Sequence, residues 1–208
     1  MNSPLRDELL AQGYTELAAY RISELLVPVK DGVRRGSLFF RLLMAASFLG
    51  GGLIAAAYIY SRQSGSLSVG EFIAWLALGM ASVILLIPFH EGIHGLLFRV
   101  FGAKDVRYGV VWRKLMFYAV AHDFAVNYRQ LLVIALGPYV VLSLGMGLAA
   151  VWLPIGWKVF FSGMYAFHTL CCVGDFGLCG YMHRFRHLKP LTFDDADARI
   201  SYFYVTSQ

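Results

Sequence analysis

The stretch FIAWLALGMASVILLIPFHEGIHGLLFRV, residues 72–100, decides the fold because it joins a long apolar run to a metal-binding pattern. Phe72–Phe89 contains no charged residue, and with the residues after it the run exceeds the ~20 apolar residues that a membrane-spanning helix needs. His90, Glu91 and His94 stand at its end. Ionisable residues are costly inside a membrane unless a metal, a partner or water receives them. The stretch therefore predicts a functional site carried by a spanning helix.

The composition of the whole chain is that of an integral membrane protein. Hydrophobic residues make up 58% of the 208 residues and charged residues 15%, and the mean hydropathy is +0.60. Soluble domains carry more charge, about a quarter of their residues. We therefore expect an all-α integral membrane protein with about four transmembrane helices. The four apolar stretches are Leu38–Tyr60, Phe72 to about Val100, Leu131–Trp157 and Val159–Met182.

Three segments follow from these spans: a cytoplasmic N-terminal segment, 1–37, a four-helix membrane domain, 38–182, and a cytoplasmic C-terminal tail, 183–208. The first 37 residues are polar and mixed in charge, without the apolar core of a signal peptide. Leucines at 5, 9 and 10 and the run Leu17–Leu26 predict short amphipathic helices there. The tail is polar and acidic and suggests no chemistry of its own.

The placement of basic residues predicts the orientation in the membrane. With a cytoplasmic N-terminus, sixteen of the eighteen Lys and Arg residues fall on the inner side, and only Arg62 and Lys158 lie outside. Cytoplasmic loops carry such an excess, so both termini are expected inside, most simply in a bacterial cytoplasmic membrane. The net charge of +5 then indicates affinity for anionic lipid headgroups and not for nucleic acid.

The segment between the second and third spans is expected to be a small β-hairpin-like or re-entrant element. Val106–Ala121 reads VRYGVVWRKLMFYAVA, two β-prone runs around a plausible turn at Arg113-Lys114. An interfacial loop is the competing interpretation. If it is a hairpin, its edge could hold an unwound peptide as an added strand. Asn127, just before the third span, is a candidate donor to a substrate carbonyl or its oxyanion.

The motif residues point to zinc chemistry. Residues four apart on a helix project from one face, so His90 and His94 can offer two imidazoles to one Zn²⁺. Glu91 lies beside them without competing for the metal, in the place of the general base of a zinc hydrolase.

A catalytic zinc site needs a third protein ligand and an open position. The candidates are His122, Asp123, His168 and Asp175. His122 and Asp123 lie in the polar connection, whereas His168 and Asp175 lie in the fourth span, seven residues or about 10 Å apart along a helix. Only one of the latter two can easily reach the metal. Asp175 matches the depth of the motif better, which leaves His168 as an outer hydrogen-bonding partner, a residue of the substrate path or a core histidine.

Small residues surround Asp175. Gly174, Gly177 and Gly180 form a strip that is expected to let the fourth span approach the second closely. The three cysteines, Cys171, Cys172 and Cys179, fall in the same span and are interpreted as packing residues, not as a disulfide.

The segments HEGIHGLLF (90–98), ALGPY (135–139) and HTLCCVGDF (168–176) together resemble the DUF3267 family of zincin-type peptidases, and more distantly the site-2 group of intramembrane metalloproteases. The resemblance covers roughly residues 81–204. It implies a membrane catalytic core with zinc on His90, His94 and Asp175 and with Glu91 as base. The context Val173-Gly174-Asp175-Phe176-Gly177 departs from the Asn-Pro-Asp-Gly or Leu-Asp-Gly of the site-2 enzymes.

The functional hypothesis is therefore a zinc-dependent intramembrane endopeptidase that cleaves membrane-associated proteins or peptides. One alternative is a non-catalytic membrane metalloprotein or scaffold. Another is a membrane di-iron oxygenase, whose support is the second H-x-x-x-H pattern, His183 to His187. Such enzymes need more histidines than the six present. His183 and His187, set among basic residues, are more simply interpreted as headgroup contacts.

Overall fold

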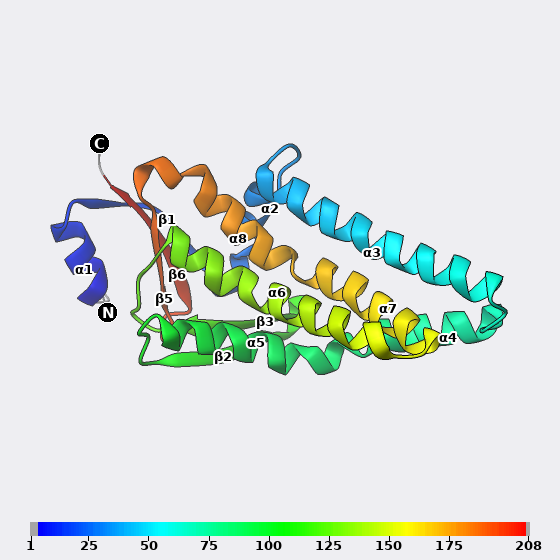
Figure 1. Cartoon of the computed structure of the whole chain (residues 1–208). Helices are drawn as coiled ribbons and strands as arrows, with labels where there is room; N and C mark the ends of the chain where they lie inside the picture. The colour runs from blue at the N-terminus through cyan, green and yellow to red at the C-terminus, as the bar shows by residue number, and fades with distance from the viewer. Residues whose placement is uncertain (1–3, 207–208) are drawn as a thin grey trace. The chain divides into compact units, whose positions relative to one another are not determined.

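A computed structural model describes residues 4–206 (Figure 1). The described α-helices are α1 (Pro4–Ala11), α2 (Leu26–Gly32), α3 (Leu38–Gln63), α4 (Val69–Ala81), α5 (Val83–Val100), α6 (Tyr128–Trp152), α7 (Ile155–Cys171) and α8 (Val173–Arg184). The strands are β1 (Tyr14–Arg21), β2 (Val106–Val111), β3 (Met116–Ala121), β4 (Val126–Asn127), β5 (Leu191–Asp195) and β6 (Ile200–Thr206).

The predicted all-α fold class is wrong, because helices are accompanied by two antiparallel sheets. One is the hairpin β2–β3, in register from Val106↔Ala121 to Val111↔Met116. The other has four strands in the order β1-β6-β5-β4. Its strands come from the two terminal segments and from the connection before α6, which hydropathy describes only as polar regions.

The four-stranded sheet joins the two ends of the chain (Figure 1). β1 pairs with β6 from Tyr14↔Thr206 to Arg21↔Ile200, with an irregularity between Glu16 and Ala18. β6 reads ISYFYVT, a run of β-branched and aromatic residues that favours a strand. The helix predicted over Leu17–Leu26 is therefore wrong for its first half, which belongs to strand β1 and pairs with β6, whereas Ile22–Glu24 forms a short 3-10 helix.

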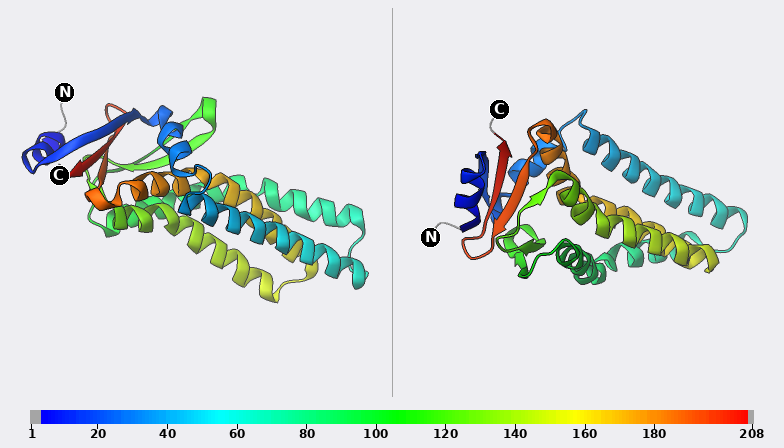
Figure 2. Two further views of the ribbon diagram at one scale, coloured as in Figure 1. Left: turned by 90° about the horizontal axis from the view of Figure 1, so that it is seen from above. Right: turned by 60° about the vertical axis from the view of Figure 1, so that its left-hand side comes forward.

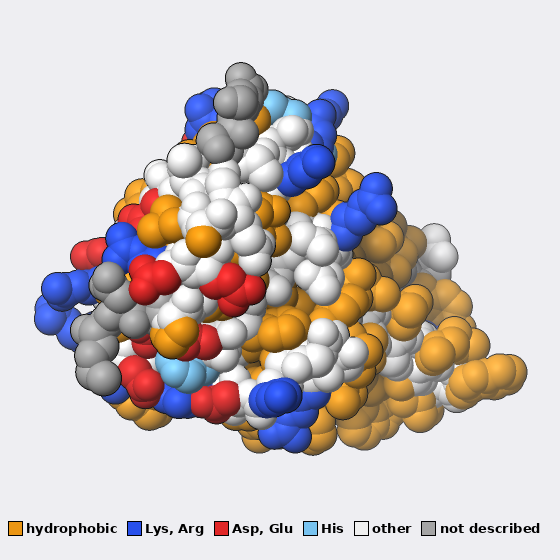
Figure 3. All heavy atoms as spheres, turned by 90° about the vertical axis from the view of Figure 1, so that its left-hand side faces the viewer, with side chains coloured by type: hydrophobic (Ala, Val, Ile, Leu, Met, Phe, Trp, Pro, Cys, Tyr) orange, Lys and Arg blue, Asp and Glu red, His pale blue; other side chains and the backbone are white. Residues whose placement is uncertain are grey.

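Helix α1 covers one face of this sheet (Figure 2). Leu9 of α1 packs with Phe193 and Tyr204, all three almost fully buried. Tyr181 of α8 contacts Phe203 edge to face, with ring centroids 5.0 Å apart. Charged side chains gather on the molecular surface around this sheet (Figure 3).

The chain divides into two compact units. Unit 1 comprises Met1–Phe40, Glu91–Pro138 and Gly174–Gln208, and unit 2 comprises Arg41–His90 and Tyr139–Val173. Unit 1 contains both sheets. Unit 2 is a helical bundle whose core includes Val83, Met146, Phe160, Met164 and Tyr165.

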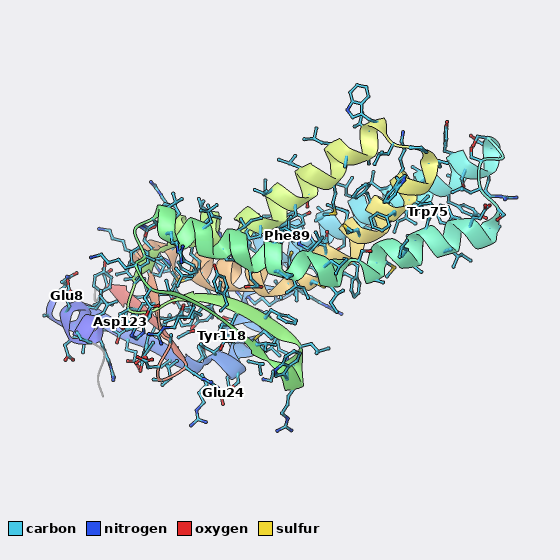
Figure 4. The ribbon with its side chains drawn as sticks, turned by 90° about the horizontal axis from the view of Figure 1, so that it is seen from below. Glu8, Glu24, Trp75, Phe89, Tyr118 and Asp123 are labelled. Atoms are coloured by element: carbon cyan, nitrogen blue, oxygen red, sulfur yellow. The ribbon has the colours of Figure 1, made fainter. Side chains whose placement is uncertain are left out.

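Close backbone contacts hold α4 against α7 in unit 2. A Cβ added to Gly79 would lie 2.0 Å from the Phe160 carbonyl oxygen, and one added to Gly163 would lie 2.7 Å from that of Leu76. Trp75, labelled in Figure 4, contacts Trp157 with ring centroids 5.2 Å apart. Small residues at such crossings are typical of helices packed in a membrane.

Three helical segments of the described chain are long and apolar enough to cross a membrane: Leu38–Gln63, Val69–Val100 and Tyr128–Trp152. A fourth is obtained if the bent pair Ile155–Cys171 and Val173–Arg184 counts as one span. These agree with an integral membrane protein. Large apolar side chains remain exposed on α5, among them Ile84, Leu85 and Phe89, as expected of a surface that faces lipid.

The glycine strip of α8 packs elsewhere than predicted. A Cβ on Gly32 of α2 would lie 1.8 Å from the Gly177 carbonyl oxygen, and one on Gly180 would lie 2.3 Å from that of Gly32. Gly177 and Gly180 thus receive α2, a short helix of the N-terminal segment, because only glycines leave room for two backbones this close.

Candidate metal centre

Helix α5 carries His90, Glu91 and His94 within little more than one turn. It continues through Pro88, and the division between the two units falls inside it, between His90 and Glu91. Phe89, the residue before the motif, is exposed on the apolar surface of α5 (Figure 4). The i, i+4 spacing therefore places both imidazoles on one face of a continuous helix.

The ring of His94 is fixed by a backbone carbonyl. Its Nδ1 lies 2.8 Å from the carbonyl oxygen of Ile134 on α6, and the residue is 8% exposed. A carbonyl accepts only, so Nδ1 carries the proton and donates it. In the neutral ring this leaves the lone pair on Nε2. A metal-ligating histidine is held in this way by a partner on its other nitrogen.

Asp175 faces that second nitrogen. Its Oδ1 lies 3.4 Å from His94 Nε2, and it stands in the first turn of α8, directly after the bend that separates this helix from α7. Metal–ligand bonds of ~2.0–2.2 Å in a tetrahedron put an imidazole nitrogen and a carboxylate oxygen roughly 3.4 Å apart. The lone pair, the carboxylate and their separation fit a zinc ion between them.

The Nδ1 of His90 also has a polar partner, in this case a second imidazole. This atom lies 3.1 Å from Nε2 of His168 on α7. His168 Nε2 can donate or accept, and when it accepts, His90 keeps the lone pair of Nε2 for a ligand, one turn before His94 on the same helix. His90, His94 and Asp175 together make up a group of side chains that could hold a metal ion.

His122 lies in a different network of unit 1. Its Nδ1 accepts a hydrogen bond from the Ala196 amide at 3.2 Å, and its Nε2 lies 3.4 Å from Asp197 Oδ2. A ring that accepts at Nδ1 carries its proton on Nε2, so it donates to Asp197 and offers no lone pair there. The Arg107 guanidinium, 2.6 Å from the other oxygen of Asp197, holds the pKa of that carboxyl below its usual value.

Asp123 and Asn127 have structural contacts of their own. Asp123 adopts a positive φ of 49°, and its amide donates to the Asp194 carbonyl at 3.0 Å. The Asn127 side-chain oxygen accepts from the amides of Arg129 and Gln130 at 2.9 and 3.0 Å. Asn127 therefore caps the N-terminus of α6, and its side-chain nitrogen is the atom left for a substrate.

His183 and His187 do not join a metal-ligand group within residues 4–206. The hydroxyl of Tyr128 lies 2.6 Å from His183 Nδ1, and Phe39 packs edge to face on the same ring. These contacts are those of a histidine packed against aromatic side chains, and they give no support to a di-iron centre.

Two participants were missed by reasoning from the sequence. The Ile134 carbonyl could not be found because every residue has one, although it directly precedes the ALGPY segment. Cys172 lies 3.6 Å from His168 Nε2. The spacing His168–Cys172, i and i+4, could have drawn attention to it.

In a comparison with protein-family models, residues 83–187 match DUF3267, described as "Putative zincin peptidase". The match covers just over half of the chain. The chain belongs to the DUF3267 family. The family predicted from the three motif segments is thus confirmed, and its description agrees with a zinc metallopeptidase. No curated protein and no solved structure matches the chain.

Proposed function

We propose that this DUF3267 member is a zinc-dependent intramembrane endopeptidase that cleaves membrane-associated proteins or peptides. Support comes from the family match, from helices able to span a membrane and from the donor set on α5 and α8. The observation that carries the proposal is the pair formed by His94 Nε2 and Asp175 Oδ1, 3.4 Å apart, with His94 Nδ1 turned to a carbonyl.

His90, His94 and Asp175 would hold the zinc ion, and Glu91 would serve as base. A zinc ion so held acidifies water and polarises a substrate carbonyl. Glu91 takes a proton from the attacking water and delivers it to the leaving amide nitrogen. It stands between the two histidines in sequence, so the helix keeps it within reach of the same point.

The remaining predicted residues take supporting roles in the proposal. His168 orients His90 through their 3.1 Å contact. Asn127 could donate only from its amide nitrogen, since its oxygen caps α6. The ring nitrogens of His122 face Ala196 and Asp197, so His122 is not assigned to the zinc ion. It stays a candidate contact for the substrate chain.

The hairpin β2–β3 offers an edge for an unwound substrate. The register of β2 with β3 makes it a preformed template for strand addition, which recognises backbone and not sequence. Tyr118 of β3 is labelled in Figure 4. A Cβ on Gly95 would lie 1.9 Å from the Tyr108 hydroxyl, so the side chain of Tyr108 on β2 reaches α5 just beyond His94.

The test compares wild-type protein with Glu91→Gln and His94→Ala in detergent, by elemental analysis and by cleavage of a single-span peptide. We expect wild type to hold zinc and to cleave, and Glu91→Gln to hold zinc with activity lower by about 100-fold or more. His94→Ala should lose both. Zinc-loaded wild type that cleaves no single-span peptide favours the non-catalytic metalloprotein. A fully active Glu91→Gln protein refutes the mechanism.

A further inference from the structure

A second cluster of metal-ligating atoms lies entirely within unit 2. It consists of His90 at the end of the unit's part of α5, and of His168 and Cys172 at the end of α7. His90 Nδ1 is 3.1 Å from His168 Nε2, and this nitrogen is 3.6 Å from Cys172 Sγ. The ligand atoms of all three residues lie within 4.8 Å of one another. We propose that they form a binding site for a soft, thiophilic cation.

The separations are those that one tetrahedral ion imposes on its ligands. Bonds of ~2.0–2.1 Å to nitrogen and ~2.3 Å to sulfur put two nitrogens roughly 3.3–3.4 Å apart and nitrogen and sulfur roughly 3.5–3.6 Å apart. The 3.1 and 3.6 Å contacts come within a few tenths of an ångström of both values. A cation can therefore enter with small side-chain shifts.

Local structure fixes two of the three ligands. His168 and Cys172 are four residues apart and share one helical face, and the Cys172 amide donates to the His168 carbonyl at 3.1 Å. The ring of Tyr139 stacks on His168 at an interplanar angle of 14°. Both ligands are almost fully buried, at 2% and 1% exposure, so water competes little for the ion.

The donor types select the cation. A thiolate with two imidazoles favours soft or borderline ions such as Cd²⁺, Cu⁺ and Zn²⁺ over Mg²⁺ or Ca²⁺. A thiolate also neutralises one charge of a divalent ion, which reduces the cost of placing it among apolar helices. In this proposal Cys172 is a cation ligand, in addition to the packing role predicted from the sequence.

Sharing His90 couples this site to the proposed catalytic zinc, a consequence that rests on the proposed function. With a proton on Nδ1, His90 donates to His168 and keeps Nε2 for zinc. With a soft cation on Nδ1, the ring can also bind zinc through Nε2 only as an imidazolate, which carries no proton on either ring nitrogen. Occupation of the second site therefore opposes zinc at the first.

The probe is Cd²⁺, titrated into the full chain in detergent with a reductant that carries no thiol. Binding is followed by the ultraviolet thiolate-to-metal charge-transfer absorption and by elemental analysis. We expect the band in wild type to saturate at one equivalent per chain. Cys172→Ser should lose the band, whereas Cys171→Ser, the adjacent exposed thiol, should keep it. His168→Gln should weaken Cd²⁺ binding at this band by at least about tenfold.

A wild-type protein without the band, a band that persists in Cys172→Ser, or one lost in Cys171→Ser overturns the proposal. Asp175→Ala separates it from the proposed function, because this variant should keep the cadmium–thiolate band even where it loses zinc. In zinc-loaded protein, Cd²⁺ should displace zinc at a concentration about tenfold lower in wild type than in Cys172→Ser. Equal displacement refutes the coupling of the two sites.

Discussion

In each motif histidine, the ring nitrogen Nδ1 contacts a polar group of a neighbouring helix. The Ile134 carbonyl accepts a hydrogen bond from Nδ1 of His94, and His168 faces Nδ1 of His90. Because a neutral imidazole carries one proton, the carbonyl contact leaves the lone pair of His94 Nε2 for a ligand before any ion arrives, whereas His168 can donate to His90 or accept from it. The histidine pair was predictable from spacing alone, whereas the partners come from α6 and α7 and required the fold.

The third ligand can be decided by two alanine variants. Asp175→Ala removes the carboxylate that lies 3.4 Å from His94, and we expect zinc affinity to fall by at least about tenfold, as losses around metal sites do. Asp123→Ala, the candidate in the polar connection, should leave it unchanged. Chelator competition measures both constants. If Asp123→Ala loses zinc and Asp175→Ala does not, the assigned ligand set is wrong.

Asp194 on β5 gives a pH dependence to the sheet. Burial raises the pKa of its carboxyl to about 6, although a hydrogen bond from the Ser201 hydroxyl acts in the opposite direction. The residue as a whole is only partly buried, so its carboxyl group is the buried part. An unfolded Asp titrates near ~3.9, so the folded state binds the proton more tightly. This contribution to stability is complete below about pH 4 and is lost as the pH rises through 6.

We therefore expect wild type to lose stability between pH 4 and pH 7 relative to Asp194→Asn. The asparagine oxygen still accepts from Ser201 but does not ionise. The measurement is the thermal unfolding midpoint of both proteins across this range in one detergent. Identical pH profiles would show that Asp194 does not ionise with a raised pKa.

At the scale of elements, the α2–α8 crossing depends on two glycines. A Cβ on Gly32 would lie 1.8 Å from the Gly177 carbonyl oxygen, so Gly32→Ala must push the helices apart. Such overpacking typically costs about 1–3 kcal/mol, and we expect a lower unfolding midpoint. Gly51→Ala is the control, because a Cβ on Gly51 of α3 meets nothing within 4 Å. Equal midpoints for the two variants would contradict the crossing.

The spans were predictable element by element, and the sheets were predictable only in part. Apolar runs of span length locate α3, α4–α5 and α6, and Val106–Ala121 carries its hairpin pattern locally. The pairing of Tyr14–Arg21 with Ile200–Thr206 joins opposite ends of the chain. The residue pattern of one segment does not indicate which distant segment it pairs with. The bend at Cys172 could not be predicted either, because no proline lies there.

At the scale of the whole molecule, the four-stranded sheet constrains the membrane topology. It joins β1, which precedes every span, to β4 between the second and third spans and to β5 and β6 after the last. Strands of one sheet lie on one side of a bilayer, since an open sheet cannot cross it. For a chain that spans the bilayer, the number of crossings between them must then be even, and we predict that the bent pair α7–α8 forms one span.

We therefore predict that α3 crosses the membrane once, with the α3–α4 loop and the sheet on opposite sides of it. In a background with Cys171, Cys172 and Cys179 changed to Ser, we expect a membrane-impermeant maleimide to label Ser66→Cys in intact cells. Ala198→Cys, in the exposed turn between β5 and β6, should react only after permeabilisation. Arg62 near the first loop and the sixteen inner basic residues favour this orientation over its reverse. Labelling of both cysteines from one side would mean that the sheet and the loop share a compartment, so that α3 does not cross the membrane between them.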